Sequence, residues 1–400
     1  MKDKVYRRHL RIAVIYFCVA AVLGLLLRSY PIISFRFNYR YMVHVHSHIA
    51  LLGWVYVALM TLLHYGFVEK QSASKRYKQL FWGTQGTLVG MLLTFPFQGY
   101  ALFSIVFSTL FLIMSYFFTY YFWKNIDPKF KDSKGLKCVK TALAYMVISS
   151  VGPWALGIIM NTLGAQSIWY RLSIYFYLHF QYNGWMILAL IGLFIFVLEQ
   201  RGLEIPIESF NRFFLSLNLG IVFTFFLSTL WTEPSTWFYI LSGIGAISQL
   251  YALTYFWSLT KNDVTVLSLS RTQSTILKIV VTLGVIKILL QLLTVIPYFS
   301  QMATTYLDFT IGYLHLTFLG VISLGLFFFM DYFGLMSMTK KSFLWYLSGF
   351  ILSEILIFSK GLFAWMGIAT FPGYTEVLAL STLLIPLSLF LMLSKKRPNA

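Results

Sequence analysis

Long apolar runs, each about 20 residues in length, recur along the whole chain and are separated by short polar stretches. A helix needs about 20 apolar residues to cross a bilayer. The pattern therefore predicts an all-α polytopic membrane protein with about twelve transmembrane helices. The predicted spans are 11–30, 41–65, 79–98, 101–123, 139–163, 172–198, 211–231, 236–259, 275–297, 306–330, 342–365 and 375–394.

Composition agrees with this pattern. The chain is 58% hydrophobic and 11% charged, far from the averages of soluble domains. No stretch is left over for a soluble domain, so residues 1–400 are expected to form a single transmembrane domain. The first span is too long for a signal peptide and lacks a small-residue cleavage site, so we expect it to be retained.

The net charge of +18 follows the predicted topology. Alternate loops hold 25 of the 31 Lys and Arg residues, which excludes a nucleic-acid partner and places both termini in the cytoplasm by the positive-inside rule. We expect a multi-pass protein of the cell inner (cytoplasmic) membrane. These positive residues lie at 2–11, 70–78, 124–140, 201–212, 261–278, 340–341 and 395–397.

A histidine motif recurs in three of the predicted spans. His44, His46 and His48 alternate with other residues in HVHSHIALLGW, and His48 precedes Gly53 by five positions. The same His-to-Gly spacing occurs in HFQYNGW at His179 and in HLTFLGV at His315. An imidazole inside a hydrocarbon layer is costly, so these five histidines are candidate functional residues.

Topology gives the repeat a geometric meaning. The second, sixth and tenth spans run in the same direction, and His46, His179 and His315 lie five, seven and nine residues into them. At 1.5 Å per residue these depths differ by roughly 6 Å. Three equivalent helices, four spans apart, predict a pseudo-threefold arrangement of four-helix units, roughly 1–135, 136–265 and 266–400.

Helical phase divides the first histidine group between two faces. His44 and His48 share a face, whereas His46 points about 200° away, so one helix can serve two sites. Imidazole pairs suit the iron of haem, and each ligand needs a partner for its second ring nitrogen. The candidate partners are Ser47, Gln181, Asn183 and Asp308, whereas His9 and His64, near the cytoplasmic ends, are interpreted as interfacial.

HVHSHIALLGW resembles the metal-bearing helix of the haem–copper oxidase catalytic subunit, and the chain is similar in length to the NnrS-type haem and copper proteins connected with nitric oxide tolerance. The resemblance covers the whole chain as topology but only about ten residues as a motif. It implies b-type haem, at least one, held by His46 or His48 with His315. A second site with His44 and His179 is a weaker implication.

The chain also departs from the oxidases. It has no histidine between His179 and His315, whereas the oxidases carry a His-His pair after the sixth span. Copper is therefore not supported by a full ligand set, and oxygen reduction at a copper centre is not expected. No Cys-x-x-Cys-His run attaches haem covalently, and Cys18 and Cys138 do not indicate a disulfide.

Charged residues within or beside the spans are further candidates. Lys360, Arg36 and Arg40 would neutralise haem propionates on the outer side, and Lys287 and Glu354 would belong to a proton path. Alternatively, Glu354 pairs with a lysine of a neighbouring span and holds helices together. Pro153 and Gly157 predict a kink in the fifth span.

The sequence thus favours a haem-binding membrane protein with a redox or nitric-oxide-related role, served by an electron-donor protein or quinol. One alternative is a twelve-span secondary transporter whose histidines carry protons or bind substrate. Another is a cofactor-free scaffold or assembly subunit that keeps the oxidase-like fold. Whether the protein is an enzyme is left open.

Overall fold

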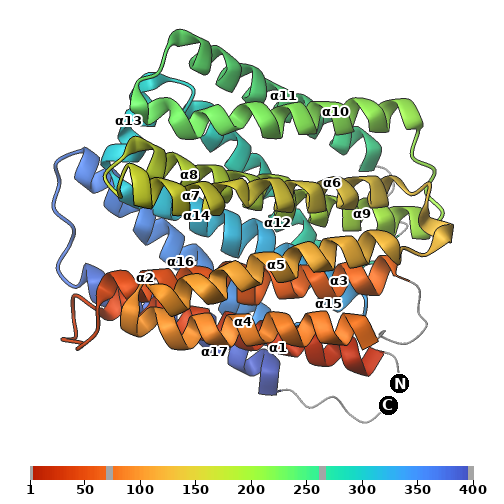
Figure 1. Cartoon of the computed structure of the whole chain (residues 1–400), viewed down its shortest axis with the longest axis horizontal. Coiled ribbons are helices and arrows are strands. Elements are labelled where there is room, and N and C mark those ends of the chain that lie inside the picture. The colour runs from red at the N-terminus through yellow and green to blue at the C-terminus, as the bar shows by residue number, and fades with distance from the viewer. Residues whose placement is uncertain (1–2, 69–74, 261–266, 395–400) are drawn as a thin grey trace. The chain divides into compact units, whose positions relative to one another are not determined.

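The computed structural model of this chain describes residues 3–68, 75–260 and 267–394, and helices account for most of them (Figure 1). Within these ranges the one extended pairing is an isolated antiparallel bridge between Val68 and Ile126. Several positive charges used for the topology prediction lie outside the described residues, namely Lys2, Lys70, Lys261, Lys395, Lys396 and Arg397.

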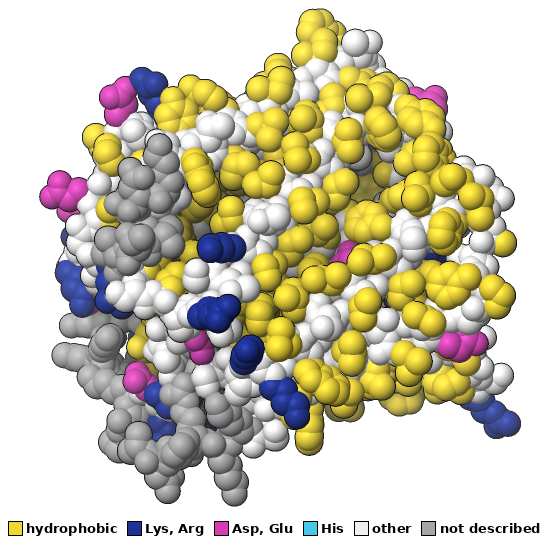
Figure 2. All heavy atoms as spheres, turned by 180° about the vertical axis from the view of Figure 1, so that it is seen from behind, with side chains coloured by type: hydrophobic (Ala, Val, Ile, Leu, Met, Phe, Trp, Pro, Cys, Tyr) yellow, Lys and Arg dark blue, Asp and Glu magenta, His cyan; other side chains and the backbone are white. Residues whose placement is uncertain are grey.

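The protein is an all-α polytopic membrane protein. Ten helical segments of the described chain are long and apolar enough to cross a membrane. The other two predicted spans are also helices, α4 (Lys75–Gln98) and α11 (Thr236–Thr260), with 24 and 25 residues. Large apolar side chains such as Phe97 and Trp237 are exposed, and hydrophobic side chains dominate the surface seen in Figure 2. A surface of this kind suits contact with lipid.

By its internal contacts the chain divides into two compact units, residues 1–127 with 326–400, and residues 128–325. The three internal units of the sequence analysis stay a prediction. Unit 1 contains α1 (Asp3–Ser29), α2 (Tyr39–His48), η1 (Ile49–Tyr56), α3 (Val57–Phe67), α4, α5 (Leu102–Lys124), α16 (Lys340–Trp365) and α17 (Tyr374–Ser394). Helix α15 (Leu324–Tyr332) begins in unit 2 and continues into unit 1.

Unit 2 contains the remaining helices. They are η2 (Pro128–Phe130), α6 (Lys134–Ser149), α7 (Val151–Thr162), α8 (Ile168–His179), η3 (Phe180–Ile187), α9 (Leu188–Gln200), α10 (Ile207–Phe223), η4 (Thr224–Thr232), α11, α12 (Arg271–Leu293), α13 (Pro297–Thr305), α14 (Leu307–His315) and η6 (Leu316–Ser323).

Polar side chains mark where several helices begin. Asn38, Ser133 and Ser270 each accept a hydrogen bond from a backbone N–H in the first turn of α2, α6 and α12. Such caps satisfy N–H groups that have no partner within the helix. The fifth predicted span is broken at Ser150, between α6 and α7, three residues before Pro153. Pro153 and Gly157 both lie within α7, and the kink predicted from them stays a prediction.

The three spans that carry the repeated motif are the most enclosed of the ten. In Tyr39–Phe67, Ile168–Gln200 and Leu307–Tyr332, 78%, 89% and 72% of an apolar 18-residue stretch is buried, against no more than 44% in the other seven. In unit 1, η1 lies against α1, and Trp54 of η1 stacks on Phe17 of α1 with ring centroids 4.7 Å apart. The inner spans are thus the ones that carry the repeated motif.

Each of these three spans contains a wide π-helical stretch of eight residues. The stretches η1, η3 and η6 begin directly after His48, His179 and His315, and the fifth residue of each is the repeated glycine. A Cβ on Gly53 would come within 2.9 Å of Tyr16, and one on Gly184 within 2.7 Å of Tyr145. The glycines therefore allow a tyrosine of the preceding span to pack against the wide stretch. π-Bulges are rare and are frequently found at functional sites.

Candidate functional site

The histidines of α2 point to two faces, as helical phase predicts. The rings of His44 and His48 lie beside Tyr100, at centroid distances of 4.6 and 5.7 Å. His46 instead faces α1, where its Nδ1 lies 2.9 Å from the backbone carbonyl oxygen of Ala20. One short helix therefore presents imidazoles to two different surroundings within unit 1.

The hydrogen bond of His46 determines which nitrogen carries the proton. A carbonyl oxygen only accepts, so Nδ1 donates and Nε2 keeps its electron pair. Nε2 has no hydrogen-bond partner among the described residues. Gly24 borders the ring, and a Cβ there would come within 3.0 Å of Cε1. His46 thus has the tautomer that a metal ligand needs, and its axial role on haem stays a prediction.

His48 and His315 occupy equivalent positions and make equivalent hydrogen bonds. In each ring Nδ1 donates over 2.8 Å to the carbonyl oxygen four residues earlier, that of His44 or Ile311. Both rings therefore carry the electron pair on Nε2. At His48 this nitrogen accepts from the hydroxyl of Tyr100 at 3.2 Å, a bond that a metal ion would replace. Both residues thus have the tautomer that a metal ligand needs, and their ligand roles stay a prediction.

His179, the third equivalent residue, is arranged differently. Its Nε2 donates to the carbonyl oxygen of Ile221 at 2.8 Å, and its Nδ1 accepts from the Asn183 amide at 3.3 Å. Both ring nitrogens are thus engaged inside a site where the side chain is 1% exposed. His179 thus differs in tautomer from His46, His48 and His315, since its Nε2 carries the proton and its Nδ1 the electron pair, and its ligand role stays a prediction. The predicted contact with Asn183 is present, but the amide donates to the ring and does not accept its proton.

Asn183 forms hydrogen bonds with both His179 and a buried lysine. Lys287 of α12 donates to Asn183 Oδ1 at 2.7 Å and to Gln291 Oε1 at 3.0 Å. Its amine also lies 5.5 Å from the ring centroids of both Tyr182 and Tyr313. The lysine is 3% exposed, and its hydrogen-bond acceptors are neutral amides.

A buried ammonium inside a membrane is costly, so this arrangement indicates a function or a demand for helix-to-helix specificity. We call the group formed by His179, Tyr182, Asn183, Lys287, Gln291 and Tyr313 the lysine cluster. From the sequence alone, only the position of Lys287 within a span could be seen.

The other predicted ring partners contact different groups. Ser47 donates to the backbone oxygen of His44 at 2.9 Å, and Gln181 donates to the hydroxyl of Ser149, also at 2.9 Å. The interpretation of Ser47 and Gln181 as partners of histidine rings is therefore wrong. Asp308 lies in the first turn of α14, seven residues before His315, and its supporting role stays a prediction.

The charged candidates divide by exposure. Arg36, Arg40 and Lys360 are exposed, whereas Glu354 of α16 is buried. Neither carboxylate oxygen of Glu354 has a hydrogen-bond partner among the described residues, so the alternative in which a neighbouring lysine pairs with it is wrong. The guanidinium of Arg28 is close enough to influence both Glu354 and His46 electrostatically.

His9 and His64 are buried within the protein, which their interpretation as interfacial residues did not foresee. They are 2% and 1% exposed and lie in a cluster of tyrosines between α1, α3, α4 and α5. The ring of His64 bridges two hydroxyls, that of Tyr6 at 2.9 Å from Nδ1 and that of Tyr121 at 3.2 Å from Nε2. His9 Nδ1 lies 3.2 Å from the hydroxyl of Tyr77.

This histidine–tyrosine cluster was missed because position along a span does not show which face of the helix is covered. The spacing of Tyr6 and His9, three residues apart near the start of the first span, was the one available signal.

His44, His46 and His48 belong to unit 1, and His179 and His315 to unit 2. Which of them serve together stays a prediction. Across residues 3–68, 75–260 and 267–394, no three His, Cys, Asp or Glu side chains gather in a group that could hold a metal ion by themselves. No family model matches the chain, and no curated protein matches its sequence.

Proposed function

We propose that this protein is a haem-binding membrane protein whose axial ligands are drawn from His46, His48 and His315. The observation that carries the proposal is the shared state of these three rings. Each donates Nδ1–H to a backbone carbonyl and so directs its basic nitrogen away from the helix backbone. Bound haem would supply one-electron redox chemistry, or gas binding if one axial position stays open.

The repeated π stretches support this proposal. Three spans with the same motif have the same local distortion directly after the histidine, which argues for an internal threefold repeat of twelve transmembrane helices. A two-halved transporter predicts two similar halves instead. The distribution of positive charge supports cytoplasmic termini, and so a location in the cytoplasmic membrane with a quinol or a protein as electron donor.

An absorbance spectrum of the purified protein, oxidised and then reduced with dithionite, tests the proposal. We expect a Soret band and a sharp α-band from bis-imidazole haem, with haem content lowered in His46→Ala and His315→Ala. Addition of nitric oxide or carbon monoxide to the reduced protein then reports whether an axial position is open.

His9→Gln serves as the control, because it changes a histidine that the proposal does not use. His179→Gln is the informative contrast: its Nε2 carries the proton that the carbonyl of Ile221 accepts, so we expect haem content to stay unchanged. A colourless protein from haem-replete cells would overturn the proposal. Retention of the full spectrum in all the single alanine variants would overturn the ligand assignment.

The lysine cluster favours a second candidate function, transport coupled to a buried charge. Ionisable residues within membrane spans commonly mark substrate or proton pathways. Under this hypothesis the protein binds no haem, and reconstituted vesicles show solute or proton movement that Lys287→Met abolishes. The absorbance spectrum separates the two functions before any flux is measured.

A further inference from the structure

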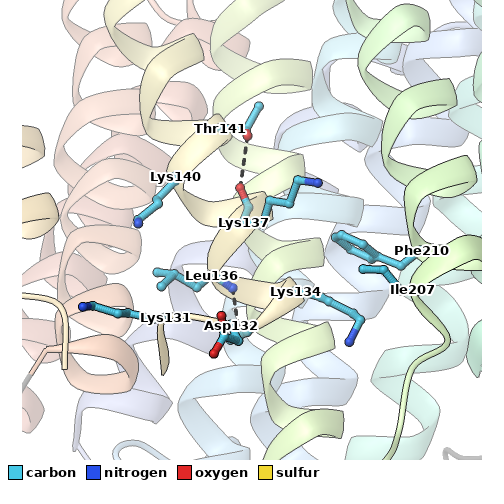
Figure 3. Close-up of a pocket in the computed structure, with 10 residues that line it drawn as sticks. Lys131, Asp132, Lys134, Leu136, Lys137, Lys140, Thr141, Ile207 and Phe210 are labelled. Carbon is cyan, nitrogen blue, oxygen red and sulfur yellow. Dashed lines mark hydrogen bonds between the residues drawn. The ribbon is translucent and has the colours of Figure 1, made fainter. Parts of the chain in front are cut away.

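A basic pocket lies where helices α6 and α10 of unit 2 begin (Figure 3). Its cavity of about 360 Å³ is within the size range of small-molecule sites. Four lysines and a single acidic residue line it: Lys131, Lys134, Lys137, Lys140 and Asp132. The pocket is therefore strongly positive.

The lysines are not used to balance charges of the protein. The N-terminal turn of α6 already has an anion, because Glu199 accepts from the Ser133 hydroxyl at 2.6 Å and from the backbone N–H of Lys134 at 2.7 Å. None of the four lysine amines forms an ion pair with a carboxylate of the described residues. Their charge is thus available to a ligand from outside.

The pocket is also partly apolar. The amine of Lys137 lies 4.6 Å from the ring centroid of Phe214 and 5.6 Å from that of Phe210, and in Figure 3 this amine points toward Phe210. Ile207, at the rim, is 63% exposed. A ligand that matches the site therefore combines an anionic group with an adjoining apolar part.

Position in the topology identifies the source of such a ligand. α6 and α10 start where two of the membrane-spanning segments start, in loops that the distribution of Lys and Arg assigns to the cytoplasmic side. The headgroups of the inner leaflet lie at this level. Basic pockets between transmembrane helices on this side commonly bind anionic headgroups.

We propose that this pocket binds the phosphodiester headgroup of an anionic phospholipid, with Lys134 and Lys137 contacting the phosphate and Ile207 contacting the start of the acyl region. Lys131 and Lys140 point away from Phe210 in Figure 3 and add to the local positive potential. The proposal does not depend on haem, so it can be tested independently of the proposed function.

Native mass spectrometry of the full-length protein, incubated with phosphatidylglycerol or phosphatidylcholine, tests it. We expect wild type to retain phosphatidylglycerol selectively. The triple variant K134Q/K137Q/K140Q should retain it at least tenfold less, since each amine near an anionic surface contributes roughly a fivefold change in binding. The control K78Q/K340Q/K341Q removes the same charge from exposed lysines of other helices and should behave as wild type.

Two further arms distinguish the lipid from free phosphate. Ile207→Ser should weaken phosphatidylglycerol retention while all lysines remain, and inorganic phosphate should not displace the lipid. Undiminished retention in the triple variant overturns the proposal, as does an equal loss in the control. Displacement by inorganic phosphate overturns the assignment to lipid.

Discussion

Separating Lys287 from Asn183 tests whether the lysine cluster holds its helices together. The perturbations are Lys287→Met, Asn183→Leu and the double variant. Lys287→Met removes a charge together with its bond to Asn183, so the loss of the bond and the relief of desolvation oppose each other. Asn183→Leu leaves the buried ammonium without its nearest acceptor, 2.7 Å away, and should therefore be the more damaging change.

The expected magnitude follows from hydrogen bonds between membrane helices. Neutral ones average about 0.6 kcal/mol in double-mutant cycles. Bonds to a charged group are roughly twice as strong as neutral ones. The coupling free energy between Lys287 and Asn183 should therefore be about 1–2 kcal/mol. Asn183→Leu removes the bond from Asn183 to His179 both in the wild type and in Lys287→Met. The contribution of this bond therefore cancels from the double-mutant cycle.

Equilibrium unfolding in mixed micelles with increasing SDS, followed by far-UV circular dichroism, gives the free energies of unfolding. Lys278→Met is the control, because Lys278 is exposed on the same helix and its removal should leave stability unchanged. The reasoning is refuted if the two single changes add to the double change within about 0.5 kcal/mol. It is also refuted if Lys287→Met is the more destabilising of the two.

Three further changes probe other parts of the fold by the same unfolding assay. Gly184→Ala should destabilise by about 1–3 kcal/mol, since its Cβ would clash with Tyr145, and no effect would show that η3 shifts freely. His64→Leu should cost about 2–3 kcal/mol, because two buried tyrosine hydroxyls each lose a hydrogen bond; a cost equal to that of Tyr121→Phe would contradict this. Glu354→Gln should not lower stability, because no hydrogen bond is lost, and a clear decrease would reveal a partner.

The sequence predicted the fold class well, and for a simple reason. Crossing a bilayer requires a long apolar helix whatever its neighbours are, so each of the twelve predicted spans is helical. The two faces of α2 were also predictable, because helical phase is a local property.

The side-chain partners depended on packing that a single sequence does not show. Asn183 and Lys287 are 104 residues apart, so nothing local indicated their hydrogen bond. The interpretation of His64 used its distance from the span end, whereas its burial depends on which helices surround that end. The His-to-Gly spacing was visible in the sequence, but it did not show that the helix widens there or that a tyrosine packs against Gly53 and Gly184.

The wide stretches η1, η3 and η6 have a mechanical consequence. A π-helical segment changes the rotation per residue, so the part of each span before it is set in a different angular phase from the part after it. The direction of each imidazole can thus be set independently of how the rest of its span packs. Deleting one residue within such a stretch would rotate the two parts of the span relative to each other. The histidine ring would then point in another direction, although the histidine itself is unchanged.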